Sequence, residues 1–134
     1  MNTKKSVALA AIILSINLSI MANANAETVT VKCISNTEES NISVIGTGHV
    51  AALWRASIRS GTAPAVFSKL PLKRTVNGEV EYDFSSNPAD IRRGETPILA
   101  TFVKNKHVTG NLYKVSNTGA LTLVGSVTAT CTVK

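Results

Sequence analysis

The stretch GEVEYDFSSNPADIRR, residues 78–93, decides the fold class of this chain. In its first half Val80, Tyr82 and Phe84 fall on one side of an extended segment, and polar residues alternate with them. A period of two is typical of a strand with one buried face. The first half therefore predicts a half-buried β-strand.

The second half of the same stretch predicts a single helical turn. Asn87 is suited to cap a helix, Pro88 to the first helical position, and Asp90 to the positive end of the helix. Arg92 and Arg93 follow at the negative end, before a glycine. A buried strand that leads into a short capped turn is the local architecture that we expect here.

The start of the chain has the three-part layout of a secretory signal peptide. Two lysines precede an apolar run at residues 7–20, and small residues follow it. A membrane-spanning helix needs ~20 mostly apolar residues, and this run is shorter and contains polar residues. Overlapping Ala-x-Ala patterns allow cleavage after Ala24 or Ala26, of which we favour Ala26. Residues 1–26 are therefore predicted as a signal peptide and 27–134 as one periplasmic or secreted domain, with no transmembrane segment in the mature chain.

The basic residues of the chain are scattered. Of 14 lysines and arginines two lie in the predicted leader, so the mature chain keeps 12 against 8 acidic residues, a net charge of +4. Aromatic residues make up only 4% of the sequence, so the charges have no stacking platform and nucleic acid is not the expected partner. A basic surface that meets anionic lipid or polysaccharide is one hypothesis, and a solvated surface is the alternative. The candidates for this surface are Arg55, Arg59, Lys69, Lys73 and Arg74.

The two cysteines lie near the two ends of the predicted domain. Cys33 shares a face with Val29 and Val31, and Cys131 shares one with Val127 and Ala129. In an exported chain two cysteines on core faces predict one disulfide between the first and last strands. The chain-entropy model gives such a long loop ~4.7 kcal/mol of stabilisation. Two buried free thiols are the alternative, and a metal site lacks the close ligand spacing that it needs.

The remaining segments read as strands separated by turns. Residues 51–60 alternate and carry the only tryptophan, Trp54, as core filler. An Asn-Gly pair predicts a hairpin between residues 72–76 and the strand of Tyr82. Residues 96–104 are apolar on both faces, which predicts a buried central strand.

Three further strands are predicted toward the C-terminus. Residues 108–115 and 120–124 are expected to form a hairpin. Gly125 is expected to interrupt the run of strand residues before the last strand. We therefore expect an all-β, immunoglobulin-like antiparallel sandwich of about 7–9 strands, with one short helical turn and one disulfide.

No pattern of catalytic residues is recognisable, so we predict no enzyme and no cofactor. A calcium site is the sharpest alternative, because Asp83, Ser85, Asn87 and Asp90 offer oxygen atoms at alternating positions. The glycine and the bidentate glutamate of a calcium loop are missing.

The segments NISVIG and EVEYDFSSNPADIRRGETPI, with the VTG of residues 108–110 and the ATC of residues 129–131, resemble a group of small exported bacterial proteins. That group shares an early and a late cysteine and a DFDSN-type segment. Ser85 stands where its pattern often has a second aspartate, which weakens the calcium hypothesis. The resemblance implies a one-domain exported module and no particular activity.

The function that we expect is a non-catalytic module that binds a protein or a cell-envelope component. A fimbrial or pilus-like subunit is the second class, because such subunits are small, exported, disulfide-bonded and rich in strands. A secreted inhibitor or calcium-binding module is the third.

Overall fold

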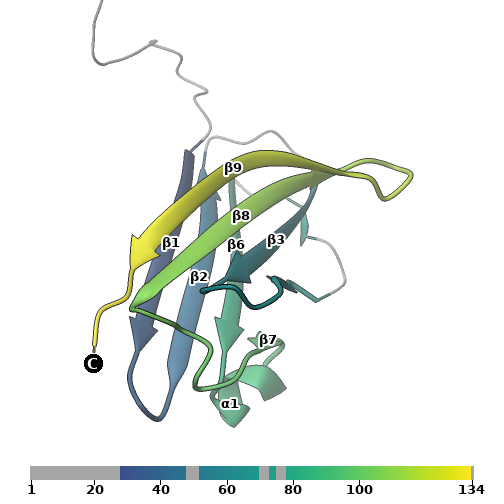
Figure 1. The fold of residues 1–134 in the computed structure, drawn as a ribbon. Helices are drawn as coiled ribbons and strands as arrows, with labels where there is room; N and C mark the ends of the chain where they lie inside the picture. Colours follow the sequence, from purple (N-terminus) through teal and green to yellow (C-terminus); the bar gives the residue numbers. More distant parts are fainter. Residues whose placement is uncertain (1–27, 48–51, 70–72, 75–77, 134) are drawn as a thin grey trace, which may run out of the picture.

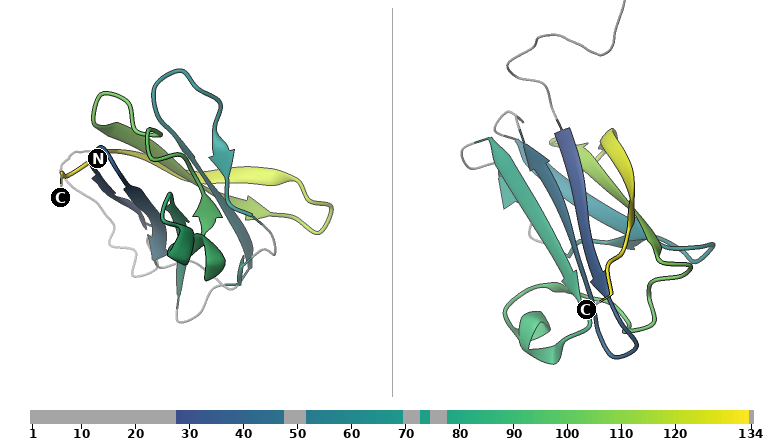
Figure 2. Two further views of the ribbon diagram at one scale, coloured as in Figure 1. Left: turned by 90° about the horizontal axis from the view of Figure 1, so that it is seen from below. Right: turned by 90° about the vertical axis from the view of Figure 1, so that its left-hand side faces the viewer.

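The computed structural model describes residues 28–47, 52–69, 73–74 and 78–133, which form an all-β sandwich of two sheets with one short helix (Figure 1). The first sheet has the order β1-β2-β6-β7, and the second has the order β4-β3-β8-β9, with β5 also paired to β3. Figure 1 shows β8 and β9 crossing obliquely over β1, β2 and β6, and Figure 2 shows the same two layers from the side and from below. The predicted sandwich is therefore confirmed.

The strands of the first sheet are β1 (Thr28–Ser35), β2 (Ser40–Thr47), β6 (Glu79–Ser85) and β7 (Thr96–Pro97). The strands of the second sheet are β3 (Leu53–Arg59), β4 (Val66–Phe67), β5 (Lys73–Arg74), β8 (His107–Val115) and β9 (Leu121–Thr130). All described pairs are antiparallel except β6 with β7, which is parallel over two residue pairs. The helix α1 (Pro88–Arg92) follows β6, with Asn87 as its N-cap and Pro88 in its first turn, as predicted.

The core lies between the inner faces of the two sheets. From the first sheet Val80, Tyr82 and Phe84 are buried, which confirms the face predicted from the alternation. From the second sheet Trp54 is fully buried beside Leu112, as expected for core filler. Each such side chain contributes about 1.5–3 kcal/mol through apolar burial.

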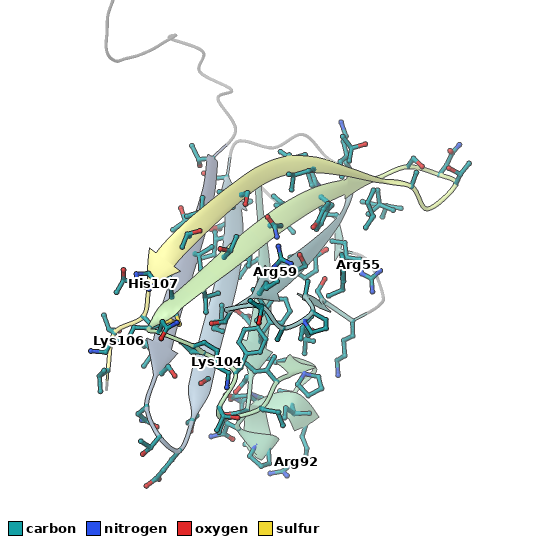
Figure 3. All side chains as sticks on the ribbon, in the orientation of Figure 1. Arg55, Arg59, Arg92, Lys104, Lys106 and His107 are labelled. Atoms are coloured by element: carbon teal, nitrogen blue, oxygen red, sulfur yellow. A yellow bond between two sulfur atoms is a disulfide. The ribbon has the colours of Figure 1, made fainter. Side chains whose placement is uncertain are left out.

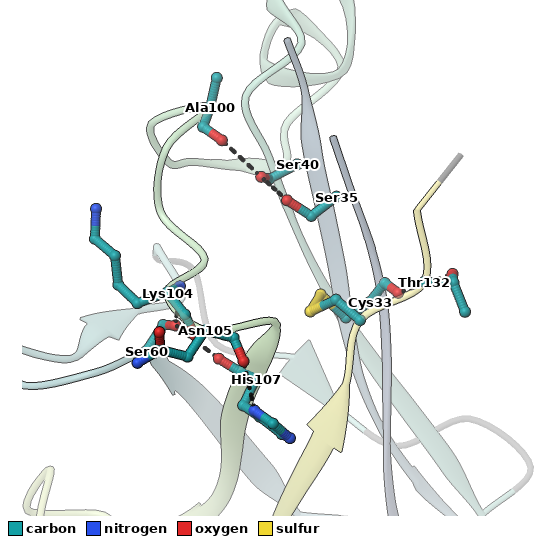
Figure 4. The surroundings of a disulfide bond; sticks show 10 residues. Cys33, Ser35, Ser40, Ser60, Ala100, Lys104, Asn105, His107 and Thr132 are labelled. Atoms are coloured by element: carbon teal, nitrogen blue, oxygen red, sulfur yellow. Dashed lines mark hydrogen bonds between the residues drawn. A yellow bond between two sulfur atoms is a disulfide. The ribbon is translucent and has the colours of Figure 1, made fainter. Parts of the chain in front are cut away.

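One edge of the sandwich is closed by the last residues of the chain. The predicted disulfide between Cys33 and Cys131 is present. Beyond β9 the N–H of Thr132 donates to the carbonyl of Cys33 at 3.0 Å, and the N–H of Ser35 donates to the carbonyl of Thr132 at 2.9 Å (Figure 4). The end of the chain thus leaves the second sheet and pairs in parallel with β1 of the first.

Two glycines let the second sheet approach the first closely. A Cβ atom on Gly110 would lie 2.5 Å from Val31 Cγ2, and one on Gly125 would lie 2.4 Å from Val29 Cγ2. Both distances are far below van der Waals contact. The prediction that Gly125 interrupts the chain is wrong, because β9 runs through it, and Val124 forms a bulge there without a partner in β8.

Residues 96–104 do not form the predicted central strand. Only Thr96 and Pro97 pair with β6, and Leu99 is 74% exposed. Pro97 has no N–H to continue a ladder, and the chain turns where the N–H of Phe102 donates to the carbonyl of Leu99 at 3.0 Å. Ile98, Phe102 and Val103 of this segment pack in or against the core from a loop.

The predicted hairpin at residues 72–78 is also wrong. Its first strand, of which β5 is the described part, pairs with β3 in the second sheet, whereas β6 pairs with β2 in the first. Asn77 lies outside the described residues, and Gly78 has the positive φ of 76° that a turn requires. Within the described ranges no helix has the length and apolarity to cross a membrane.

Candidate binding surface on the second sheet

The outer face of the second sheet gathers the arginines that the sequence singled out. Because Trp54, Ala56 and Ile58 point into the core, the residues between them point outward. The strand register then places aromatic and polar residues of three neighbouring strands beside them. We call this surface the basic-aromatic face; its residues are Arg55, Ser57, Arg59, Phe67, Thr109, Asn111, Tyr113, Leu121, Leu123, Ser126 and Thr128.

The centre of the basic-aromatic face is a stacked aromatic pair. The rings of Phe67 and Tyr113 lie 5.7 Å apart between centroids, with an angle of 29° between their planes. The guanidinium of Arg55 lies 5.0 Å from the Phe67 centroid, and its Nε donates to the carbonyl of Ser68 at 3.0 Å. These contacts hold a planar cation in one place, where it needs little further ordering to bind an anionic group.

A buried polar cluster supports this pair from below. Ser57 is fully buried although it points outward, because the aromatic side chains of this face flank it. Its Oγ lies 3.2 Å from the hydroxyl of Tyr113 and accepts from Nδ2 of Asn111 at 3.3 Å. The cluster therefore fixes the position of the Tyr113 ring and of the Asn111 amide.

Large apolar side chains are exposed on this face, one in the aromatic pair itself and two on β9. Phe67, Leu121 and Leu123 are 36%, 39% and 54% exposed. Protein interfaces often combine an apolar centre with arginine, and this face has both.

Acidic side chains are segregated between the two sheets, whereas basic side chains lie on both, with Lys32 pointing outward from β1 of the first sheet. Every carboxylate side chain in residues 28–133 belongs to the first sheet, to its β1–β2 turn or to the segment of α1. The second sheet carries Arg55 and Arg59, with His107 at the start of β8 and Lys104 and Lys106 in the preceding turn (Figure 3). The basic-aromatic face is therefore free of acidic residues.

The other predicted basic residues lie apart from this centre. Lys69 follows β4 and is exposed, and its N–H donates to Oγ1 of Thr96 at 3.0 Å. Lys73 and Arg74 form β5 beside Trp54 and Leu53, and their side chains lie outside the described residues.

The aromatic and polar members of the face were missed in the sequence. Nothing local links Phe67 to Tyr113, because they lie on strands that are far apart along the chain and share only β3 as a neighbour. The alternation of residues 108–115 was the available signal, since it places Thr109, Asn111 and Tyr113 on one side.

The first sheet presents the opposite charge on its outer face. Glu79, Glu81 and Asp83 point outward from β6, and we call them the acidic row. The hydrogen bond to Asp83 raises the pKa of Glu81 above its ordinary value of 4.5; partial burial and the charges of Asp83 and Glu79 add to this rise, and Lys32 opposes it. The row is therefore a place where carboxylates repel one another.

The four calcium candidates are engaged with protein groups. Asp83 accepts from Oγ of Ser43 at 2.6 Å, and the carboxylate of Asp90 pairs with Arg93. Oγ of Ser85 lies 2.8 Å from Oδ2 of Asp90, while Asn87 caps the helix. In the described part of the chain no group of three or more His, Cys, Asp or Glu residues is arranged to hold a metal ion. Calcium binding at this turn is the alternative to a chain without a metal site, and both hypotheses stay predictions.

The contacts of His107 do not place it in a catalytic arrangement. His107 is exposed, and its Nδ1 lies 2.6 Å from the carbonyl of Asn105. His49 lies outside the described residues.

A shallow apolar hollow of about 360 Å³ lies between the β3–β4 loop and the segment after β7, with Pro64, Ile98 and Phe102 in its lining.

Comparison of the chain with models of known protein families, with curated protein sequences and with solved structures found no match.

Proposed function

We propose that this chain is an exported, non-catalytic module that binds the acidic surface of a protein through its basic-aromatic face. The observation that carries the proposal is an outer sheet face that has fixed aromatic and arginine side chains and no carboxylate. Tyrosine and arginine are the residues most enriched among energetically dominant interface positions. An anionic polysaccharide or lipid would use the same charges, but it would have less use for the exposed leucines of this face.

The test is capture of a partner from cell-envelope extract by the purified, disulfide-bonded protein. We expect saturable recovery of a protein by the wild type and loss of that recovery in Arg59→Glu. The matched control is Arg92→Glu, which changes the net charge equally but lies on α1, away from the sheet (Figure 3). Equal losses in both variants, or none, would overturn the proposal. Recovery of polysaccharide or lipid instead would assign the face to the other class of partner.

We also propose that residues 1–26 are removed as a signal peptide and that the protein works in the periplasm or outside the cell. A disulfide that joins the two sheets supports an oxidising compartment. Mass spectrometry of the protein from the periplasmic fraction should find a chain that starts at Glu27, or at Asn25 if the alternative site is used. An intact leader or two reduced cysteines would contradict this.

The partition of strands supports an immunoglobulin-like topology for the sandwich, which we propose as the finer class of fold. If β1, β2, β3, β6, β8 and β9 correspond to strands A, B, C, E, F and G, the sheets have the compositions ABE and CFG. The disulfide joins the first and last strand regions, whereas antibody domains join strands B and F. An experimental structure with a different strand order would reject this assignment.

A further inference from the structure

The two outer faces of the sandwich carry charges of opposite sign at the same spacing. Arg55 and Arg59 point outward from β3 and are four residues apart, and Glu79 and Asp83 point outward from β6, also four residues apart. At about 3.3 Å per strand residue, both pairs span about 13 Å. The backbone spacing of the two arginines on β3 therefore matches that of the two carboxylates on β6 of another molecule.

The groups between these charges are complementary as well. Glu81 lies midway along the acidic row, and Ser57 lies midway between the two arginines. Ser57 is flanked by the Tyr113 hydroxyl and the Asn111 amide, which can donate hydrogen bonds to a carboxylate. A carboxylate placed over Ser57, beside the aromatic pair, thus has the Tyr113 hydroxyl and the Asn111 amide group as hydrogen-bond donors.

Symmetric pairing through these faces is disfavoured. Two basic-aromatic faces would oppose arginine with arginine, and two acidic rows would oppose carboxylates that already repel one another, as the raised pKa of Glu81 indicates. An arriving guanidinium would relieve that repulsion. Opposite faces attract, and like faces do not.

We propose that the acidic surface recognised by the basic-aromatic face is the acidic row of a second copy of this chain, so that molecules associate head to tail. This inference rests on the proposed function, because it names a partner for the same face. Each head-to-tail pair keeps one free face of each kind, so the contact is heterologous and grows into open linear assemblies unless its rotation closes a ring. No strand is exchanged, which distinguishes it from the donor-strand assembly of pilus subunits.

The test is sedimentation velocity of the purified, disulfide-bonded protein at low and high salt. At about 0.01 M salt, where the Debye length is ~30 Å, the wild type should form species larger than a monomer; at about 1 M, where it is ~3 Å, these should dissociate. Arg59→Glu blocks one face, and Glu79→Gln with Glu81→Gln blocks the other. Each variant alone should remain monomeric at low salt, whereas Arg92→Glu should associate like the wild type.

Mixing the two blocked variants gives the sharpest result. The intact arginines of one variant meet the intact acidic row of the other, so an equimolar mixture should form a one-to-one dimer that grows no further. A monomeric wild type at low salt, or a variant that still forms a symmetric dimer, would overturn head-to-tail association. If the wild type is monomeric but Arg59→Glu still loses an envelope partner, the proposed function stands without self-association; if neither effect appears, both proposals fail.

Discussion

The inner faces of the two sheets are alike, and their outer faces are opposites. Inside, both sheets present tightly packed apolar side chains, and neither Gly110 nor Gly125 has room for a Cβ atom. Outside, β6 presents three carboxylates, whereas the second sheet presents arginine and aromatic rings without any acidic residue. Folding does not need this segregation, because mixed charges on the outer faces would avoid the repulsion within the acidic row. Packing therefore explains the inner faces. It does not explain why carboxylates lie on only one outer face, and we attribute that difference to what each outer face binds.

Removing the bond that joins the sheets should have the largest effect on stability. Replacing both Cys33 and Cys131 by Ala releases a loop that spans 98 positions in the unfolded chain. The chain-entropy model sets the loss at up to ~4.7 kcal/mol, of a total that is typically ~5–15 kcal/mol. Urea unfolding followed by circular dichroism should show the lower midpoint.

A control separates the covalent bond from the hydrogen bonds beside it. Thr132→Val removes only a side-chain hydroxyl, whose Oγ1 donates to the carbonyl of Cys33 at 3.3 Å. We expect this variant to lose no more than about 0.5 kcal/mol. A double cysteine variant as stable as Thr132→Val would show that the two sheets hold together without the disulfide.

Filling the tight contact between the sheets should have the next largest effect. In Gly110→Ala the new Cβ would lie 2.5 Å from Val31 Cγ2 and 3.0 Å from Val44 Cγ2. Overpacking of this kind costs about 1–3 kcal/mol in the free energy of unfolding. Val31→Ala in the same background should recover part of the loss, because it removes the nearer methyl. If the stability losses of Gly110→Ala and Val31→Ala simply add in the double variant, the contact with Val31 is not the reason that residue 110 is glycine.

A change on the outer face of the second sheet should cost less. Ser57→Ala removes the buried hydroxyl beside Tyr113 and Asn111, and we expect a loss of about 1 kcal/mol. Thr128→Ala is the matched control, because its Oγ1 lies 2.7 Å from that of Thr109 in an exposed pair, and it should cost less than about 0.5 kcal/mol. Thermal unfolding of both variants measures the difference. Equal losses of stability in Ser57→Ala and Thr128→Ala would mean that the hydroxyl of Ser57 does not hold the basic-aromatic face in position.

The smallest effect should come from the acidic row of the first sheet. Because the pKa of Glu81 is raised in the folded state, folding favours its protonated form, and this group lowers stability as pH rises from 4.5 through the raised value. Glu81→Gln removes that penalty, so it should raise the melting temperature at pH 7 and leave it nearly unchanged at pH 4. The gain should stay below about 1 kcal/mol, since the carboxylate is mostly exposed. Glu38→Gln, in the β1–β2 turn, is the control; a larger gain there, or a gain at pH 4, would contradict the repulsion.

The local sequence pattern correctly predicted the elements that are defined within a single segment of the chain. The strand of Val80, Tyr82 and Phe84, the alternation around Trp54 and the capped turn at Asn87 were all correct, because each depends on neighbours in sequence. The segment after Thr96 was predicted wrongly as a strand because apolar residues on both faces indicate burial, which a loop packed against the core also provides.

Pairing of strands was predicted less well. An Asn-Gly pair favours a hairpin locally. Instead, β5 pairs with the first two residues of β3, in the other sheet. Of the candidate site, the sequence placed Arg55 and Arg59 on one face, and it gave no sign that Phe67 and Tyr113 would stack beside them.

The sequence by itself determined that this chain is an all-β sandwich with its two ends joined by a disulfide, because alternation and the faces of two cysteines are properties of single segments. Only the tertiary structure decided which strands become neighbours, and thereby which side chains share an outer face. Carboxylates that are dispersed along the chain lie on the first sheet or in the segments that adjoin it, and arginines and aromatic rings from separate strands meet on the second. The physical reason is that the order of strands in a sheet is set by long-range packing of the inner faces, which no local pattern records.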